Sequence, residues 1–291
     1  MSISHRAATL LAIILPFVGL IAAMILAWDR GFDWIQLALL FGMYVVTGLG
    51  ITVGFHRFFA HKSFSTNRYV QAALAVMGSM ACEGPLLRWV AYHRSHHQHS
   101  DGEEDPHTPH GHGHGMVALV KGFWKAHIGW LFDPASRSLG KYVKDLKRDK
   151  FVRRMSALFP LWVLLGLLIP TVLGGLLTMS WTGAGLGLLW GGLVRIFLVH
   201  HVTWSINSVC HIWGSQPFRS HDESRNNPIF GILAFGEGWH NNHHAFPYSA
   251  RHGLRWWQID TSYIVIRVLS WFGLAWNIRV PSRERMMAKM R

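Results

Sequence analysis

Eight histidines fall into three short clusters, and imidazole is a ligand that suits iron, zinc, copper and nickel. The clusters are His56 and His61; His93, His96 and His97; and His240, His243 and His244. The H-x-x-H-H spacing of the second and third clusters puts three rings on one face of a helix. His56 and His61 would stand about 140° apart on an α-helix, so we expect the helix to fray or bend there. Eight rings exceed what one metal needs, so the clusters predict two metals.

Histidine is unusually frequent in a chain that is otherwise apolar. The 20 histidines outnumber the 15 acidic residues, and half of the 291 residues are hydrophobic. Cys82 and Cys210 are too few to form a disulfide framework, a thiolate zinc site or an iron–sulfur site by themselves. Lys and Arg total 28, which gives a net charge of +13. Such a charge suits nucleic acid, an anionic membrane surface or an acidic partner, and the apolar runs favour the membrane over nucleic acid.

Four apolar runs are long enough to cross a bilayer, at residues 7–28, 34–55, 156–179 and 183–207. About 22 residues form roughly 33 Å of helix, against a hydrocarbon core of about 30 Å. The first run is long for a signal peptide and a second follows at once, so we expect it to be retained.

Residues 69–92 are also apolar but include Glu83, Gly84, Pro85 and Arg88. We expect these residues to form one helix at the membrane interface or in a cap, and not a fifth span.

The connections between the four runs differ sharply in charge. The short links at 29–33 and 180–183 carry no positive excess, whereas segments 56–155 and 208–291 hold nearly all the Lys and Arg. The positive-inside rule therefore predicts that both termini and both large segments face the cytoplasm. The expected fold is a single all-α integral membrane domain over residues 1–291, with four spans as two hairpins and a cytoplasmic helical cap that holds the histidines.

The clusters resemble those of the integral-membrane fatty acyl desaturases, which include stearoyl-CoA desaturase and compact bacterial and cyanobacterial delta-9 enzymes. The likeness runs from Gly54 to Ile278 and includes the stretches DPHTP (105–109), TWSINSVCH (203–211), GEGWHNNHH (236–244) and SARHGLRWW (249–257). It implies two Fe2+ ions held by nine histidines, with an asparagine that reaches one iron through water. By this resemblance the ligands are His56, His61, His93, His96, His97, His211, His240, His243 and His244, with Asn207 bridged by water.

The spacing near the end of the fourth run is consistent with this assignment. Asn207 and His211 lie four residues apart and so share one helical face, and Thr203, Trp204 and His200 continue the same stripe. Packing within a helix bundle is the alternative explanation of Thr203 and Trp204, and the resemblance favours a wall of the substrate site.

The resemblance also bears on three residues outside that stripe. It places Trp89 beside the bend of an acyl tunnel, with Glu83 near that bend where relatives tend to carry a neutral polar residue. Glu237 fits E-x-x-H, but the core Glu helices of carboxylate-bridged di-iron bundles are missing, so we expect Glu237 to orient a ligand ring.

Several other histidines are expected to lie outside the metal site. We expect the loop histidines to be solvated, namely His99, His107, His110, His112 and His114. His201 is expected to bond a neighbour within the bundle. For His252 we expect a contact with a headgroup or a partner.

The chemistry implied is the dehydrogenation of a fatty acyl chain. A mid-chain methylene has no acidic proton and no leaving group, so it requires an oxidant that a metal cofactor generates from O2. The resemblance implies a cis product at delta-9. The chain has no haem-binding, flavin, nicotinamide or iron–sulfur motif, so an external donor such as ferredoxin or a cytochrome b5-type protein must supply two electrons. Animal acyl-CoA enzymes usually carry Arg-Asp where this chain has Ala91-Tyr92, which leaves acyl-CoA and acyl-lipid both open as substrates.

Two other functions compete with this interpretation. A membrane di-iron hydroxylase of the alkane, sterol or carotenoid type also has histidine clusters, but generally with other spacings and without the Asn207/His211 element. A non-catalytic metal-binding membrane protein, such as a transporter, should place ligands at mid-membrane on broken helices. Charged residues within the membrane normally mark ion pathways. Arg195 is the only such residue in the four apolar runs, so the sequence offers little support for a transport pathway.

Overall fold

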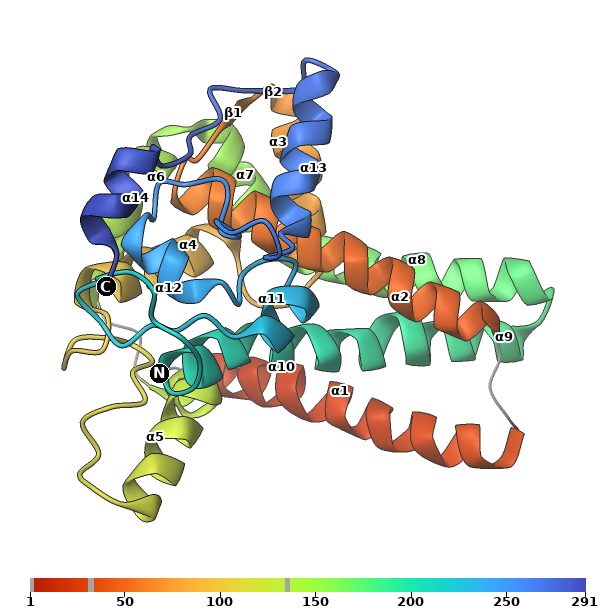
Figure 1. The fold of residues 1–291 in the computed structure, drawn as a ribbon. Coiled ribbons are helices and arrows are strands. Elements are labelled where there is room, and N and C mark those ends of the chain that lie inside the picture. Colours follow the sequence, from red (N-terminus) through yellow and green to blue (C-terminus); the bar gives the residue numbers. More distant parts are fainter. Residues whose placement is uncertain (1–2, 31–33, 134–136) are drawn as a thin grey trace.

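The computed structural model describes residues 3–30, 34–133 and 137–291, and within them four helices are long and apolar enough to cross a membrane (Figure 1). These helices cover Arg6–Ala27, Trp34–Ala60, Phe159–Thr178 and Trp181–His211. The four long apolar helices predicted from the sequence are therefore confirmed as candidate spans. The second and fourth helices continue beyond their apolar runs into the histidine-bearing segments. Of the predicted link at 29–33, residues 31–33 lie outside the described residues.

The helices and strands follow one another as α1 (Ile3–Arg30), α2 (Trp34–Leu49), η1 (Gly50–Ala60), β1 (Ser65–Thr66), α3 (Arg68–Ser79), α4 (Leu86–His99), α5 (Met116–His127), η2 (Gly129–Phe132), η3 (Arg137–Val143), α6 (Lys144–Arg148), α7 (Lys150–Ala157), α8 (Phe159–Thr178), α9 (Trp181–Gly187), η4 (Leu188–Val194), α10 (Arg195–Ser208), η5 (Val209–His211), α11 (Pro228–Leu233), α12 (His240–Ala245), α13 (Thr261–Trp271), β2 (Ala275–Trp276) and α14 (Arg283–Lys289). The elements η1 and η4 are π-helices, and η2, η3 and η5 are 3-10 helices.

Glycines let the long helices pack closely. A Cβ at Gly174 of α8 would lie 2.3 Å from the carbonyl oxygen of Gly183, and one at Gly187 would lie 2.1 Å from that of Pro170. Helices in lipid gain little from burying apolar surface against each other, so small residues that permit close contact are favoured at such interfaces. The close contact between α8 and α9 therefore depends on glycine at positions 174 and 187.

The shorter helices gather at one end of the four long helices (Figure 1). This end includes α3, α4, α12 and α14, which come from both large basic segments. A two-stranded antiparallel pair joins these segments, with Ser65 opposite Trp276 and Thr66 opposite Ala275. The expectation of a purely helical chain is wrong in this small respect. Which side of a membrane this end faces stays a prediction.

The single helix expected over residues 69–92 is two helices, α3 and α4. The turn between them contains Gly84, whose φ of +107° suits glycine, and Pro85, which precedes the first residue of α4. Proline disfavours helical backbone in the residue before it, so α3 cannot continue through Gly84. The turn matters because it places Glu83 and Trp89 in the wall of the cavity described below.

Candidate metal centre

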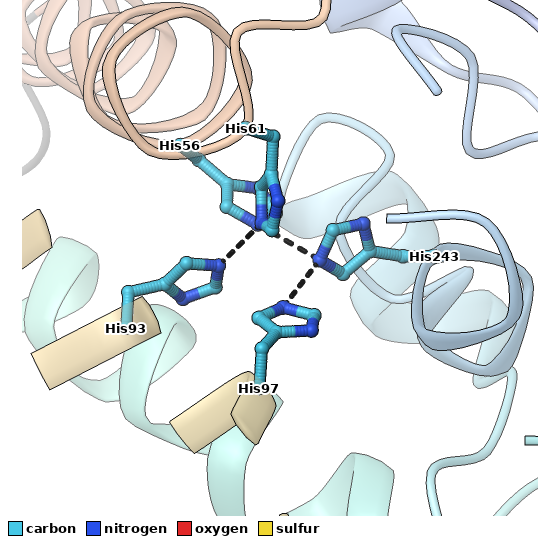
Figure 2. A group of neighbouring side chains, drawn as sticks. All are labelled: His56, His61, His93, His97 and His243. Carbon is cyan, nitrogen blue, oxygen red and sulfur yellow. Dashed lines mark hydrogen bonds between the residues drawn. The ribbon is translucent and has the colours of Figure 1, made fainter. Parts of the chain in front are cut away.

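Five histidines converge at the end of η1 (Figure 2). One nitrogen from each ring lies within 4.8 Å of one nitrogen from every other ring, and the members are His56, His61, His93, His97 and His243. The Nε2 atoms of His61 and His93 are 2.7 Å apart, and those of His97 and His243 are 2.8 Å apart. We call these rings the five-histidine group.

The π-helix η1 explains how His56 and His61 reach the same centre. In a π-helix each amide bonds the carbonyl five residues earlier, and the amide of His61 donates to the carbonyl of His56 at 3.1 Å. Residues five apart therefore lie on one side of the helix, and the two ring centroids are 4.8 Å apart. The structure therefore has a π-helix here, in place of the frayed or bent α-helix expected from the sequence.

A second group contains the other four predicted ligand histidines, His96, His211, His240 and His244, whose ring nitrogens also lie within 4.8 Å of one another. All four side chains are buried. This four-histidine group adjoins the first, because the rings of His97 and His244 stack with centroids 4.3 Å apart. Asn207 lies on the wall of a neighbouring cavity that His240 also lines.

The two H-x-x-H-H motifs serve the groups in opposite ways. Helix α4 gives His93 and His97 to the five-histidine group and His96 to the other. Helix α12 gives His240 and His244 to the four-histidine group and His243 to the five. In each helix the i, i+4 pair lies on one side and the third ring turns to the neighbouring group. One spacing used twice thus builds two adjacent sites.

Four carboxylates fix the orientation of rings in these groups. The Nδ1 atom of His56 lies 2.6 Å from Glu237, and that of His96 lies 3.0 Å from Asp105. The Nδ1 atom of His211 lies 2.9 Å from Asp101, and that of His244 lies 2.5 Å from Asp222. An ionised carboxylate only accepts hydrogen bonds, so each of these Nδ1 atoms carries a proton, and in the neutral ring the Nε2 atom then presents a lone pair. Carboxylate–histidine pairs of this kind orient the ligands of protein metal sites.

The nitrogen spacing fits shared metal ions. Two imidazole nitrogens bound at right angles to one ion, each at about 2.1 Å, are about 3.0 Å apart. The closest ring nitrogens within the groups are separated by 2.7 to 3.0 Å. The Nε2 atoms of His96 and His244 have no hydrogen-bond partner among the described residues. Buried lone pairs that converge without donors are the arrangement that a bound cation satisfies.

The protonation states agree with this arrangement. Burial, reinforced by the positive charge of neighbouring histidines, lowers the pKa of His93, His97 and His243 well below its usual value. Burial opposes the charged form of His96 too, but the carboxylate of Asp105 outweighs it and the pKa of that ring is raised. Neutral imidazole is the form that binds metals, so most of these rings are ready for a cation near neutral pH.

An apolar cavity of about 710 Å³ leads to both groups. Rings of both histidine groups reach it, through His56 and His93 of the first and His240 of the second. Its wall contains the four residues that the sequence indicated for substrate contact, Trp89, Thr203, Trp204 and Glu83, and also Asn207, which was expected to reach a metal through water. The indole of Trp89 donates to the carboxylate of Glu83 at 2.9 Å. Burial raises the pKa of Glu83 to about 7. Cavities of about 300–1,000 Å³ with mostly apolar walls and a few polar groups are typical small-molecule sites.

Two expectations about other histidines are wrong. His107 is buried, with its ring centroid 4.6 Å from that of His96, because the Asp105 carboxylate accepts from its amide and turns the loop inward. His252 is also buried, beside His56 and His243, and is out of reach of a headgroup.

The remaining loop histidines divide by exposure. His99 and His110 are partly buried and bond the Tyr142 hydroxyl and the His211 carbonyl, whereas His112 and His114 are exposed as expected. His201 bonds His127 at 3.0 Å, so the predicted bond to a neighbour is confirmed.

Sequence reasoning missed Asp101 and Asp222, because each meets its histidine only through the fold. Asp105 stands in the DPHTP stretch, but the spacing of that stretch does not show that its carboxylate meets His96. Burial of His252 had no local signal beyond its place in the SARHGLRWW stretch.

Comparison with known proteins agrees with the site. A family model described as fatty acid desaturase matches residues 32–277. The chain is 43% identical over 278 residues to a hex-5-enoyl-[acyl-carrier protein] acetylenase of Moorena producens, covering 95% of this chain and 87% of that protein. It is 40% identical over 273 residues to an sn-1 stearoyl-lipid 9-desaturase of Synechocystis, covering 92% and 80%. It is 38% identical over 271 residues to an acyl-CoA C20 Delta5-desaturase of Anemone leveillei, covering 91% and 81%. The chain therefore belongs to the fatty acid desaturase family, and it is an oxidoreductase.

Proposed function

We propose that this chain uses two irons and O2 to introduce a cis double bond at delta-9 into a saturated acyl chain of a membrane lipid. The observation that carries the proposal is the apolar cavity that reaches both histidine groups. The nine histidines, with Asn207 through water, are the proposed iron ligands. When bound, the irons supply with O2 the oxidant that removes one hydrogen from each of two adjacent methylenes, leaving a double bond and water.

The protein's part in the reaction is positioning and exclusion of water. Thr203, Trp204 and Trp89 line the cavity. The ring of Trp89 stacks on that of His93, and Glu83 holds the Trp89 ring through a hydrogen bond. A chain fixed between these side chains presents one carbon pair to the metal site, and fixed geometry of this kind accelerates a reaction strongly. The delta-9 position is supported by the name of the Synechocystis relative.

The carrier of the acyl chain is the point on which the relatives differ, since their names cite acyl-carrier protein, lipid and CoA. In this chain Leu11 and Leu15 of α1 line the cavity and are nevertheless 56% and 50% exposed, and Leu233 of α11 lines it and is 44% exposed. Residues that belong to a cavity and to the outer surface mark its opening. Because α1 is a candidate membrane span, an opening bordered by its leucines suits entry of a lipid-linked chain from the bilayer.

The distribution of charge supports a proposal for the orientation and for the electron donor. We propose that the end bearing the histidines faces the cytoplasm together with both termini, because the segments that build it carry the positive excess. Ferredoxin or a cytochrome b5-type protein is the proposed donor of the two electrons, since an acidic protein would be steered to a chain of net charge +13.

The first test is the fatty-acid profile of a host that expresses the chain, against the same host with the His243→Ala variant. Gas chromatography with location of the double bond should show a new cis delta-9 monoene that disappears in the variant. Separation of lipid classes after a short pulse of labelled stearate should show the label desaturated first within glycerolipids. A hydroxylated lipid would move the chain to the hydroxylases, and early desaturation of acyl-CoA would overturn the lipid carrier.

A further inference from the structure

His252, a buried histidine outside the nine proposed ligands, lies beside the five-histidine group. His252 is 1% exposed, and its ring centroid is 4.4 Å from that of His243 and 5.4 Å from that of His56. Neither of its ring nitrogens has a hydrogen-bond partner among the described residues. An unpaired buried polar group costs about 1–3 kcal/mol, so a histidine here needs a reason that packing does not give.

The backbone around His252 is held firmly in place. The Asp260 carboxylate accepts from the amides of His252 at 2.6 Å and Gly253 at 3.1 Å, and Asn242 donates to the His252 carbonyl at 2.7 Å. Asp260 also accepts from Arg57 at 3.0 Å. Asp260 therefore anchors both the backbone at His252 and Arg57 of η1.

The carboxylate of Glu237 lies beside the His252 ring. The Nδ1 atom of His252 lies 3.4 Å from the same Oε2 oxygen that bonds His56 Nδ1 at 2.6 Å. The other oxygen of Glu237 accepts from Arg57. Glu237, Arg57, Asp260 and His252 thus form a closed ring of contacts behind one predicted ligand.

We propose that His252 is a positioning residue, which donates from Nδ1 to Glu237 and so fixes the orientation of His56 toward its metal. The contact needs a movement of a few tenths of an ångström from 3.4 Å to become a normal hydrogen bond. A third metal among His56, Glu237 and His252 is disfavoured, because Arg57 already places a cation on Glu237. The inference rests on the proposed iron site and adds to it a residue outside the nine ligands.

The experiment compares three variants of the full chain with the wild type, each reconstituted with 57Fe(II) in detergent. His252→Leu removes both nitrogens at similar volume, His252→Gln keeps an amide donor for Glu237, and His114→Ala removes an exposed histidine far from the groups. Iron affinity is measured by competition with a chelator, and the Mössbauer spectrum reports each iron separately.

In His252→Leu we expect one of two irons to bind about 10–100-fold more weakly, with one altered Mössbauer signal, as for loss of a residue that orients a ligand. In His252→Gln the iron affinity and the Mössbauer signal should both return to the wild-type values, and His114→Ala should match the wild type. Combining His252→Leu with Glu237→Gln should add little to the effect of the Glu237 change alone, since residues in one network are not additive.

Two outcomes overturn the inference. Equal behaviour of the Leu variant and wild type would reduce His252 to packing. Complete loss of one iron in both the Leu and Gln variants, with unchanged thermal unfolding of the metal-free chains, would make His252 a ligand. A wild-type chain that holds zinc and not iron would overturn the proposed function instead, and the same affinity comparison would then be made with Zn(II).

Discussion

At the residue scale, the site depends on carboxylates as much as on histidines. Eight of the nine proposed ligands follow from short-range spacing, because each of the three clusters lies within a turn or two of helix. The ninth, His211, follows from the family resemblance. Their partners do not follow from spacing. Asp222 is 22 residues from His244 and Asp101 is 110 residues from His211, so only the folded chain brings each pair together.

Loss of the carboxylate at Asp222 tests whether these pairs matter to the metal. In Asp222→Asn the Nδ1 atom of His244 keeps an acceptor but loses the negative charge at 2.5 Å. We expect metal affinity of the four-histidine group to fall about 10–100-fold, measured by chelator competition. Glu223→Gln is the matched control, since its side chain is half-exposed. Equal affinities in the two variants would contradict the role given to Asp222.

Acid should destabilise the metal-free chain through its buried histidines. Burial lowers the pKa of His244 and His252 to about 4 each, from an unfolded value of about 6.5. Between these values the unfolded chain binds protons that the folded chain does not, so the free energy of unfolding falls as pH drops from about 6.5 to about 4. Thermal unfolding of the metal-free chain in detergent across this range measures the effect. A midpoint that stays level or rises on acidification would contradict it.

At the scale of the elements, the sequence predicted where helices cross the membrane better than how they are wound. Four apolar runs of about 20 residues, in which Arg195 is the one charged side chain, suffice to predict four spans. The π-helices η1 and η4 have no such signal, because π-helical turns are rare interruptions of α-helices and no hydrophobic period in the sequence marks them. The break between α3 and α4 does have a local signal, because the Gly84-Pro85 pair favours a turn over a continuous helix. The short β1–β2 pair joins residues about 210 apart and could not be foreseen from local pattern.

The position of η1 depends on a close contact with α3. A Cβ at Gly50 would lie 2.1 Å from the amide nitrogen of Gly78, whereas one at Gly42, in the same long helix, would meet no atom within 4 Å. We expect Gly50→Ala to cost about 1–3 kcal/mol, as overpacking does, and to weaken metal binding by shifting His56. Gly42→Ala should be neutral or stabilise by up to about 1 kcal/mol, because alanine favours helix. Thermal unfolding and iron content of both variants decide the point, and identical losses in the two would sink it.

At the scale of the whole molecule, positive charge and the metal site occur at the same end. The segment from η3 to α7 presents seven exposed basic side chains, Lys141, Lys144, Lys147, Arg148, Lys150, Arg153 and Arg154. Two aspartates within it are already paired, Asp145 with Lys62 and Arg94 and Asp149 with Arg68. The surface that remains is basic, which favours encounter with an acidic protein over a neutral one.

Reduction of the site by an acidic ferredoxin should therefore slow as salt is added. The Debye length falls from about 10 Å at 0.1 M to about 3 Å at 1 M, and steering of this kind raises association rates by about 10–1,000-fold. We expect the second-order rate of reduction in stopped flow to fall at least about tenfold over this range. In a Lys144→Glu/Lys147→Glu variant the rate should start lower and depend less on salt, because both side chains are exposed and neither contacts the histidine groups. Reduction by a small uncharged reagent is the control and should be the same in both chains. A ferredoxin rate that is independent of salt, or unchanged by the double substitution, would place the donor on another face of the molecule.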